Sequence, residues 1–235
     1  MRPLDGERKV NSGFSQAFRN GRNALRRFVP WLFVLGKWLT LLFSGRSFLR
    51  RSGYFRSVAA NRPVRQDGSP IPWMNYPVIG FLDRRLAADQ ALFEYGCGNS
   101  TLFYASRVGS VIAVEDDPAW HEAISRRLPP NARVTLCSPL DPDADAGSIA
   151  GHGRRFDVVV IDGKVRRHCL AAAPDWLTDG GVMLLDDVND AEHAEGIEAT
   201  RRRGFRVLEF EGLKPGSIRL YRTLLFYRPG NCLGL

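Results

Sequence analysis

Two acidic residues, Glu94 and Glu115, each lie at or near the end of an apolar run and carry the strongest chemical signal in this sequence. Gly96 and Gly98 follow the first run, and they let the backbone turn sharply and approach a ligand closely because glycine has no Cβ atom. The second run ends in Glu115, 21 positions beyond Glu94. In an open α/β sheet, an acid at that place binds the two hydroxyls of a ribose. The pair therefore predicts a site for a cofactor that carries a nucleoside.

The residues around the glycines distinguish between two kinds of cofactor. A dinucleotide fingerprint, Gly-x-Gly-x-x-Gly, requires a third glycine where this chain has Thr101. A pyrophosphate binds bare backbone amides at a helix N-terminus, and the carboxylate of Glu94 would repel it. The same carboxylate would attract an ammonium group. These charges favour S-adenosylmethionine over NAD, and a nicotinamide-dependent oxidoreductase stays the alternative enzyme.

The segment Glu-Tyr-Gly-Cys-Gly-Asn-Ser-Thr at 94–101, followed by Glu115, resembles motif I and the acid after it in class I S-adenosylmethionine-dependent methyltransferases. The resemblance extends from about Pro70 to the C-terminus and departs at Ser100, where the family often has a third glycine. Ser100 can instead cap the helix that we expect to open at Ser100 or Thr101. The resemblance implies that Glu94 binds the amino-acid end of the cofactor and Glu115 the ribose. The full implied set is Glu94, Tyr95, Gly96, Cys97, Gly98, Asn99, Ser100, Thr101, Glu115, Asp116 and Asp162.

Apolar runs alternate with helical patterns after this motif, which is the signal for a doubly wound parallel sheet. The expected strands are the run before Gly96 and residues 110–115, 133–137, 156–161, 182–185, 205–211 and 220–227. The expected helices are 100–108, a helix from Pro118 to about Pro129, one ending at Leu177, and 191–203. The resemblance implies an α/β, mostly parallel seven-stranded sheet of the Rossmann-like methyltransferase type, ending in an antiparallel hairpin. We expect this domain at 66–235, after a basic, partly helical extension at 1–65.

Residues after the fourth and fifth strands could bind and activate a methyl acceptor. In one scheme Asp162 and Asp187 share a divalent cation, since carboxylate oxygens suit Mg²⁺. This placement resembles the catechol-type O-methyltransferases, but Val188 replaces their asparagine and Asn189 comes one residue late, so the cation is the less favoured scheme and no metal ligand is assigned.

In the second scheme, His168 or Asp187 removes a proton from the acceptor, because histidine needs little pKa tuning for this role. Arg166 then binds an anionic acceptor. The run Asp162-Gly163…Arg166…Cys169 resembles a signature of uncharacterised bacterial methyltransferases of this class, and Arg166 is its aligned residue. The predicted catalytic residues are thus Asp162, Asp187, His168 and Arg166, acting on a small-molecule or sugar-type acceptor, at oxygen.

Aromatic residues flank both predicted sites. The prolines of 70–77 favour an extended segment, so that Trp73 and Tyr76 either lie over the ligands as a lid or anchor the segment to the core. Trp120 and His121 follow the ribose acid, where they flank the adenine or simply pack.

The positive charge of the chain lies in its first quarter. Residues 1–65 hold 14 Lys or Arg and two acids, a net charge of +12, which leaves −4 for the rest of a chain whose total is +8. Within this arm, residues 28–43 are almost all apolar but include Lys37, so the run is short for a transmembrane helix. We expect residues 20–56 to lie on an anionic membrane surface. A helix packed on protein and a true span are the alternatives, and nucleic-acid binding is disfavoured because a phosphate tract needs no apolar block.

The four cysteines are scattered and form no Cys-x-x-Cys pair, which indicates neither zinc nor a disulfide framework. We therefore expect a cytoplasmic protein, peripheral at the inner face of the membrane. The non-enzymatic alternative is a membrane-associated scaffold that keeps a vestigial cofactor fold.

Overall fold

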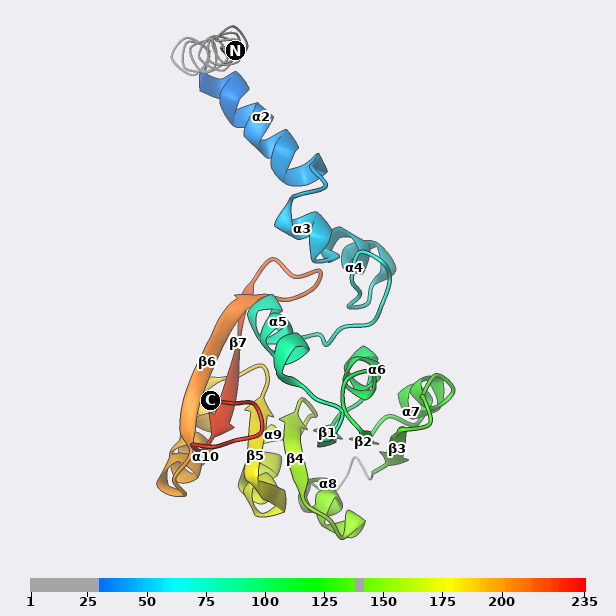
Figure 1. The fold of residues 1–235 in the computed structure, drawn as a ribbon, viewed down its shortest axis with the longest axis vertical. Coiled ribbons are helices and arrows are strands. Elements are labelled where there is room, and N and C mark those ends of the chain that lie inside the picture. Colours follow the sequence, from blue (N-terminus) through cyan, green and yellow to red (C-terminus); the bar gives the residue numbers. More distant parts are fainter. Residues whose placement is uncertain (1–29, 138–141) are drawn as a thin grey trace, which may run out of the picture. The chain divides into compact units, whose positions relative to one another are not determined.

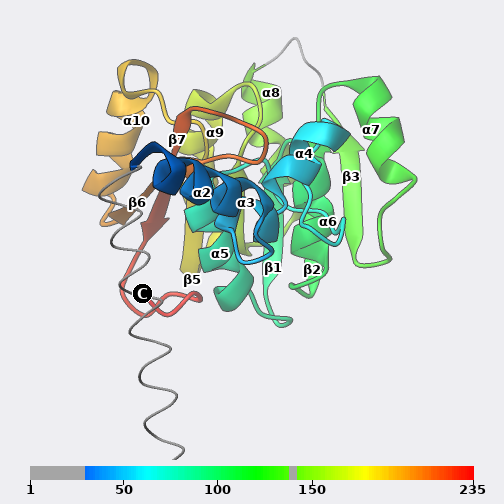
Figure 2. The ribbon, with the colours of Figure 1, turned by 90° about the horizontal axis from the view of Figure 1, so that it is seen from above.

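The computed structural model describes residues 30–137 and 142–235, which form parts of two compact units, Met1–Arg51 and Ser52–Leu235 (Figures 1 and 2). The boundary between the two units follows Arg51, whereas the expected boundary followed residue 65. Residues 52–64 thus belong to the second unit. The Ser57 hydroxyl is buried, donates to the carbonyl of Val64 over 2.9 Å and accepts from the amide of Val64 over 3.0 Å. The hydroxyl of Tyr54 donates to the carbonyl of Ser217 in the C-terminal hairpin.

The described part of the first unit is helical. It comprises α2 (Pro30–Phe43) and α3 (Phe48–Arg51). No residue of α2 is buried, and Trp31, Trp38 and Phe43 are among its exposed large side chains. By length and composition, Pro30–Arg51 would also suffice to cross a membrane, a property that signal sequences near an N-terminus share. Residues 20–29 of the predicted membrane-binding segment lie outside the described residues.

The second unit is built on one seven-stranded sheet with the order β3-β2-β1-β4-β5-β7-β6. Strands β1 to β5 are parallel, and β7 runs antiparallel to both β5 and β6. The α/β class, the mostly parallel sheet and the terminal hairpin are thereby confirmed. The strands are β1 (Ala91–Tyr95), β2 (Ser110–Glu115), β3 (Ala132–Leu136), β4 (Phe156–Ile161), β5 (Leu177–Leu185), β6 (Arg206–Leu213) and β7 (Leu220–Tyr227).

Helices cover both faces of the sheet, as Figure 2 shows. One apolar cluster joins one sheet face to side chains of α8, α9 and α10, and another joins the opposite face to α5 and α6. Strands β1, β4 and β5 supply side chains to both clusters, which explains why each contains a run of consecutive apolar residues. The helices are α4 (Tyr54–Ala60), α5 (Tyr76–Arg85), α6 (Asn99–Ala105), α7 (Pro118–Ser125), α8 (Pro142–Gly147), α9 (Arg166–Ala172) and α10 (Asp190–Arg202), with 3-10 helices η1 (Ser148–His152) and η2 (Ala173–Trp176).

The helix α5 was not expected, because the density of prolines before it argues against helix. The extended segment ends at Asn75, and helix begins at Tyr76 with Pro77 in its first turn, where a missing N–H is tolerated. The side chain of Asn75 accepts from the amide of Val78 as an N-cap and donates to the hydroxyl of Thr223 on β7 over 2.9 Å. One buried asparagine therefore starts the helix and joins it to the hairpin.

Strand β5 is longer than predicted. The Asp179-Gly180-Gly181 run, which precedes the expected strand at 182–185, lies within β5, and a register shift separates the Phe156–Leu177 pair from the Val158–Val182 pair. The helix expected to end at Leu177 ends at Ala172 and continues as the 3-10 helix η2. These differences lie at the amino end of β5, away from the carboxyl ends where the site is built.

Candidate cofactor and acceptor site

Three connected hollows lie at the carboxyl ends of the parallel strands, where open α/β sheets bind ligands. We call the first the strand-edge groove; its volume is about 400 Å³ and its lining is Glu94, Gly96, Cys97, Ser100, Glu115, Asp116, Asp117, Trp120, Asp162, Gly163, Lys164 and Arg166. The second, the hairpin pocket, has about 410 Å³ and is lined by Trp73, Asp162, Asp187, Lys214, Gly216, Ser217 and Tyr221. A third pocket of about 270 Å³ lies over the turn after β1 and includes Arg62, Asn99 and Arg127 in its lining. Asp162 lines all three.

Glu94 lies at the floor of the groove. Its carboxylate is 1% exposed and accepts a 2.6 Å hydrogen bond from the hydroxyl of Thr101. Burial raises the pKa of Glu94 to about 8, an effect that Ser100 and Thr101 counter and that Asp162 and Glu115 reinforce. A buried acid with a raised pKa gains most from a cationic partner, so this position suits an ammonium group.

The turn between β1 and α6 depends on Thr101 rather than on Ser100. The helix begins at Asn99, with Gly98 at the N-cap, and the amide of Gly98 donates to the hydroxyl of Thr101 over 3.0 Å. Thr101 thus caps the helix from its third residue and also holds Glu94, while Ser100 is left to line the groove. The expectation that Ser100 caps the helix is wrong for this reason.

Only the first glycine of the turn is required by the backbone. Gly96 has φ of 94°, a left-handed conformation that side chains disfavour, and a Cβ there would lie 3.1 Å from the carbonyl oxygen of Asp162. Gly98 has φ of 164°, which is extended, and its missing Cβ leaves room toward Ser100 and Trp120. Gly96 therefore lets β1 and β4 approach, and Gly98 leaves the turn open to a ligand.

Glu115 ends β2 beside the same turn. Its carboxylate accepts from the amide of Cys97 over 3.1 Å and from the amides of Asp116 and Asp117 over 3.1 and 3.0 Å. The residue is 8% exposed, and burial raises its pKa, although the amide of Asp117 and the contact with Cys97 favour the charged form. Each carboxylate oxygen can accept two hydrogen bonds, so Oε1 is filled by Asp116 and Asp117, and Oε2, which accepts from Cys97, retains one acceptor site toward a ribose hydroxyl in the groove.

An aromatic and a charged pair form the rim of the groove. The indole nitrogen of Trp120 donates to the carbonyl of Cys97 over 2.8 Å, so this half-exposed ring lies over the turn. The ammonium of Lys164 pairs with Asp116 over 2.6 Å. The neighbouring His121 hydrogen-bonds the carbonyl of Val134 and is not part of the groove lining.

Asp162, Arg166 and Asp187, three of the predicted catalytic residues, lie together. The guanidinium of Arg166 donates to Asp162 over 3.0 Å and lies 3.8 Å from Asp187. Burial and the nearby Asp186 raise the pKa of Asp162 to about 7, despite Arg166 and Lys214. Asp187 is a non-glycine residue with φ of 52°, a conformation that is costly and clusters at functional sites.

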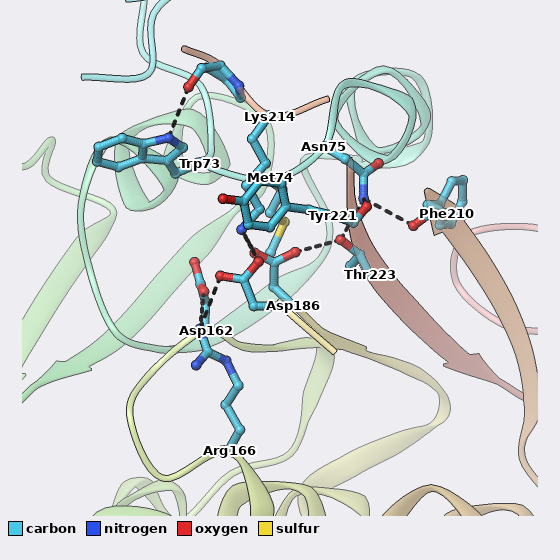
Figure 3. A network of polar contacts seen from close by, with 12 residues as sticks. Trp73, Met74, Asn75, Asp162, Arg166, Asp186, Phe210, Lys214, Tyr221 and Thr223 are labelled. Carbon is cyan, nitrogen blue, oxygen red and sulfur yellow. Dashed lines mark hydrogen bonds and ion pairs between the residues drawn. The ribbon is translucent and has the colours of Figure 1, made fainter. Parts of the chain in front are cut away.

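Asp186 completes this cluster together with Thr223 and Lys214, the two residues that sequence reasoning missed. Asp186 is fully buried, accepts from the hydroxyl of Thr223 over 2.5 Å and pairs with the ammonium of Lys214 over 2.7 Å (Figure 3). Lys214 also pairs with Asp187. The sequence shows Lys214 only as the first residue of a hairpin loop, and nothing local indicates that this loop closes over β5.

Three of the predicted site residues, Tyr95, Thr101 and His168, line none of the three pockets. The side chain of Tyr95 is buried in the core and its hydroxyl donates to the carbonyl of Ala146, so only its backbone borders the site. His168 is exposed on α9 and lines none of the three pockets. Asn99 lines the third pocket, and its amide donates to the carbonyl of Pro63 over 2.7 Å.

The two aromatic residues of the proline-rich segment have different surroundings. Trp73 is half-exposed, borders two pockets, and donates from its indole to the carbonyl of Pro215 over 3.0 Å. Tyr76 is the first residue of α5 and lines none of the three pockets. Of the two, only Trp73 is placed to cover a ligand.

Glu94 makes the stability of the ligand-free protein depend on pH. Its pKa is about 8 when folded and near the ordinary 4.5 when unfolded, so between these values the folded chain holds a proton that the unfolded chain releases. The free energy of unfolding should therefore decline as the pH rises from about 4.5 to about 8. Glu94→Gln should remove on the order of 5 kcal/mol of this decline, measured by urea unfolding across that pH range. The exposed Glu211→Gln should keep the wild-type slope, and an unchanged slope in Glu94→Gln would contradict the assignment.

Comparison with known proteins identifies the fold. A scan against protein-family models finds no match, and neither does a search of curated proteins. Among solved structures, the chain is similar to a precorrin 8W decarboxylase from Methanobacterium thermoautotrophicum, at 24% identity and a TM-score of 0.50 over 65% of this chain and 88% of that one. It is also similar to an rRNA methylase from Streptococcus thermophilus, at 18% identity and a TM-score of 0.50 over 65% of this chain and 97% of that one. Together with the sheet order, these likenesses show that the chain has the Rossmann-like fold of class I S-adenosylmethionine-dependent methyltransferases.

Proposed function

We propose that this protein transfers a methyl group from S-adenosylmethionine to an oxygen atom of a small-molecule or sugar-type acceptor. The observation that carries the proposal is the charge of the strand-edge groove, which is lined by five carboxylates and only two basic side chains. Such a lining attracts a ligand with a sulfonium and an ammonium group and repels a pyrophosphate. The same charge argues against the nicotinamide-dependent alternative.

The groove offers a partner to each part of this cofactor. Glu94 would hold the α-ammonium group, Glu115 the ribose hydroxyls, and Trp120 the edge of the adenine. The Gly96–Gly98 turn would pass beneath the ligand, and the volume of the groove is within the range of about 300–1,000 Å³ that ligand pockets span. When bound, the cofactor supplies a methyl group on a positively charged sulfur that leaves as a neutral thioether.

The hairpin pocket would hold the acceptor. It shares Asp162 with the groove, so a ligand in either hollow borders the same carboxylate. Trp73 and Tyr221 offer flat apolar faces there, and Asp187 offers a hydrogen-bond acceptor for a second hydroxyl. This mixture of aromatic faces and carboxylates suits a polyhydroxylated molecule.

Asp162 would act as the general base. A hydroxyl acceptor must lose its proton as its oxygen bonds to the methyl carbon, and the proton would pass to the carboxylate of Asp162. A base is most effective when its pKa lies near the working pH, and burial places that of Asp162 at about 7. Arg166 would hold this carboxylate in place rather than bind an anionic acceptor, because its guanidinium is paired with Asp162.

Cofactor binding tests the first half of the proposal. Glu94→Gln removes the charge beneath the ammonium group and should weaken binding of S-adenosylmethionine or its demethylated product by about 10- to 100-fold, since a hydrogen bond to a charged group contributes about 1.5–3 kcal/mol. Isothermal calorimetry measures this, with Glu211→Gln as the unaffected control. Micromolar binding of NAD without binding of S-adenosylmethionine would reverse the choice of cofactor.

The pH dependence of methyl transfer tests the base. Because Asp162 must be ionised to accept a proton, the rate should rise with pH and level off above about pH 7. Asp162→Asn should lower kcat by about 100- to 10,000-fold, the usual contribution of a positioned base. His168→Gln, on the exposed face of α9, is the matched comparison. A rate that depends on His168 and not on Asp162 would overturn the assignment, and a protein with no product from any acceptor would favour the scaffold alternative.

We further propose that the N-terminal unit attaches this cytoplasmic enzyme to the inner face of a membrane. Exposed apolar side chains on α2, including Trp31 and Trp38, are flanked by basic residues such as Arg46, Arg50 and Arg51. Tryptophans beside basic residues suit an anionic lipid interface.

Vesicle sedimentation tests this attachment. The whole chain should bind anionic vesicles at least about tenfold better than neutral ones, because each basic residue near such a surface contributes about 1 kcal/mol, and added salt should weaken the binding. A chain lacking residues 1–51 should stay in the supernatant. Equal binding to neutral vesicles in high salt would favour a membrane span, and unchanged binding of the shortened chain would refute the attachment.

A further inference from the structure

Three carboxylates at the ends of β4 and β5 form a group that could hold a metal ion. Asp162, Asp186 and Asp187 each present an oxygen within 4.8 Å of the others. Oxygen donors gathered in this way are the ligands that Mg²⁺ and Mn²⁺ prefer. Asn189, the amide that the catechol-type pattern would add, instead caps α10 by accepting from the amide of Ala191 over 3.1 Å.

A basic side chain of the protein already lies among these carboxylates. The ammonium nitrogen of Lys214 is 2.7 Å from an oxygen of Asp186 and also pairs with Asp187. It lies 4.7 Å from the centre of the Tyr221 ring, an arrangement that favours a cation over an aromatic face. The side chain of Lys214 is only 7% exposed. Two carboxylates and one ring therefore surround a single compact positive charge (Figure 3).

The surrounding structure holds Lys214 in this place. It follows β6 directly and begins the loop to β7, whose carbonyls at Pro215 and Ser217 accept hydrogen bonds from Trp73 and Tyr54. The second oxygen of Asp186 is fixed by the hydroxyl of Thr223. Hydrogen bonds therefore tie the loop to two segments upstream of the sheet. They fix the backbone at Lys214, whose buried side chain places its ammonium group between the carboxylates.

We propose that Lys214 is a built-in cation that takes the place of a divalent metal in the acceptor pocket and positions Asp187 there. A divalent ion would need the carboxylate oxygens that the ammonium now uses, and the two positive charges would repel each other. The acceptor is then bound by hydrogen bonds rather than by chelation, so it does not need two adjacent hydroxyls. The effect on methyl transfer rests on the function proposed above, whereas the exclusion of metal does not.

Titration of the whole protein with Mn²⁺, followed by electron paramagnetic resonance, tests the exclusion. The wild type should show no specific Mn²⁺ site, and this measurement needs no variant. Lys214→Met keeps the length of the side chain and frees the carboxylates, so it should bind one Mn²⁺ at least about tenfold more tightly than the wild type. Adding Asp186→Asn to Lys214→Met should abolish that site. Arg222→Met, which frees the exposed Asp190 and Glu209, is the matched control and should gain none.

Enzyme assays test the positioning role. Methyl transfer by the wild type should be unaffected by EDTA. Lys214→Met should lose rate without losing cofactor affinity and should regain part of that rate when Mn²⁺ or Mg²⁺ is added, a rescue that a merely structural lysine would not show. Lys214→Arg, which keeps the charge, should retain more activity than Lys214→Met.

Two results would overturn the proposal. The first is a wild-type protein that binds one Mn²⁺ and loses it on Asp187→Asn. The second is a folded Lys214→Met variant that binds cofactor but gains no Mn²⁺ site. If no variant transfers methyl groups at all, the proposed function fails, and the Mn²⁺ titrations still decide whether Lys214 excludes a metal.

Discussion

Parallel strands bring their carboxyl ends to one edge, and in this protein that edge concentrates carboxylates. Five acids lie at or just after the carboxyl ends of four strands, and all are buried or partly buried: Glu94, Glu115, Asp162, Asp186 and Asp187. Removing a carboxylate from water is costly unless it is paired, hydrogen-bonded or protonated. The hydroxyls, amides and cations around this edge are therefore the groups that offset the cost of burying each acid.

The cost of burying each acid is offset by a different kind of partner, and the partner decides what the acid is free to do. Backbone amides hold Glu115, the hydroxyl of Thr101 holds Glu94, and the ammonium of Lys214 pairs with both Asp186 and Asp187. Asp162 is left between them with one guanidinium partner and access to all three pockets. A buried acid with a raised pKa in a cleft is a candidate for chemistry, and burial raises the pKa of Glu94 to about 8 and that of Asp162 to about 7.

Elements outside the parallel sheet complete the site. The loop between β6 and β7 brings Lys214, Gly216 and Ser217 to the hairpin pocket, and the segment before α5 brings Trp73. Hydrogen bonds join these two pieces at Pro215 and, through Asn75, at Thr223. A change in either piece would therefore move the hairpin pocket while leaving the strand-edge groove in place. This separation would let the ligand of the hairpin pocket vary while the strand-edge groove stays constant.

Local sequence determined the parallel sheet, the terminal hairpin and the residues that β1 and β2 place in the groove, because each depends on short-range signals. Consecutive apolar residues mark the strands, a glycine allows the left-handed turn after β1, and acids stand where strands end. Local sequence did not determine α5, whose start depends on Asn75 reaching β7, nor the cap of α6, which Thr101 supplies while holding Glu94. It also could not distinguish a metal site from an ion pair at Asp186 and Asp187. That choice depends on Lys214, 27 positions beyond Asp187, and only the folded hairpin brings the ammonium and the carboxylates together.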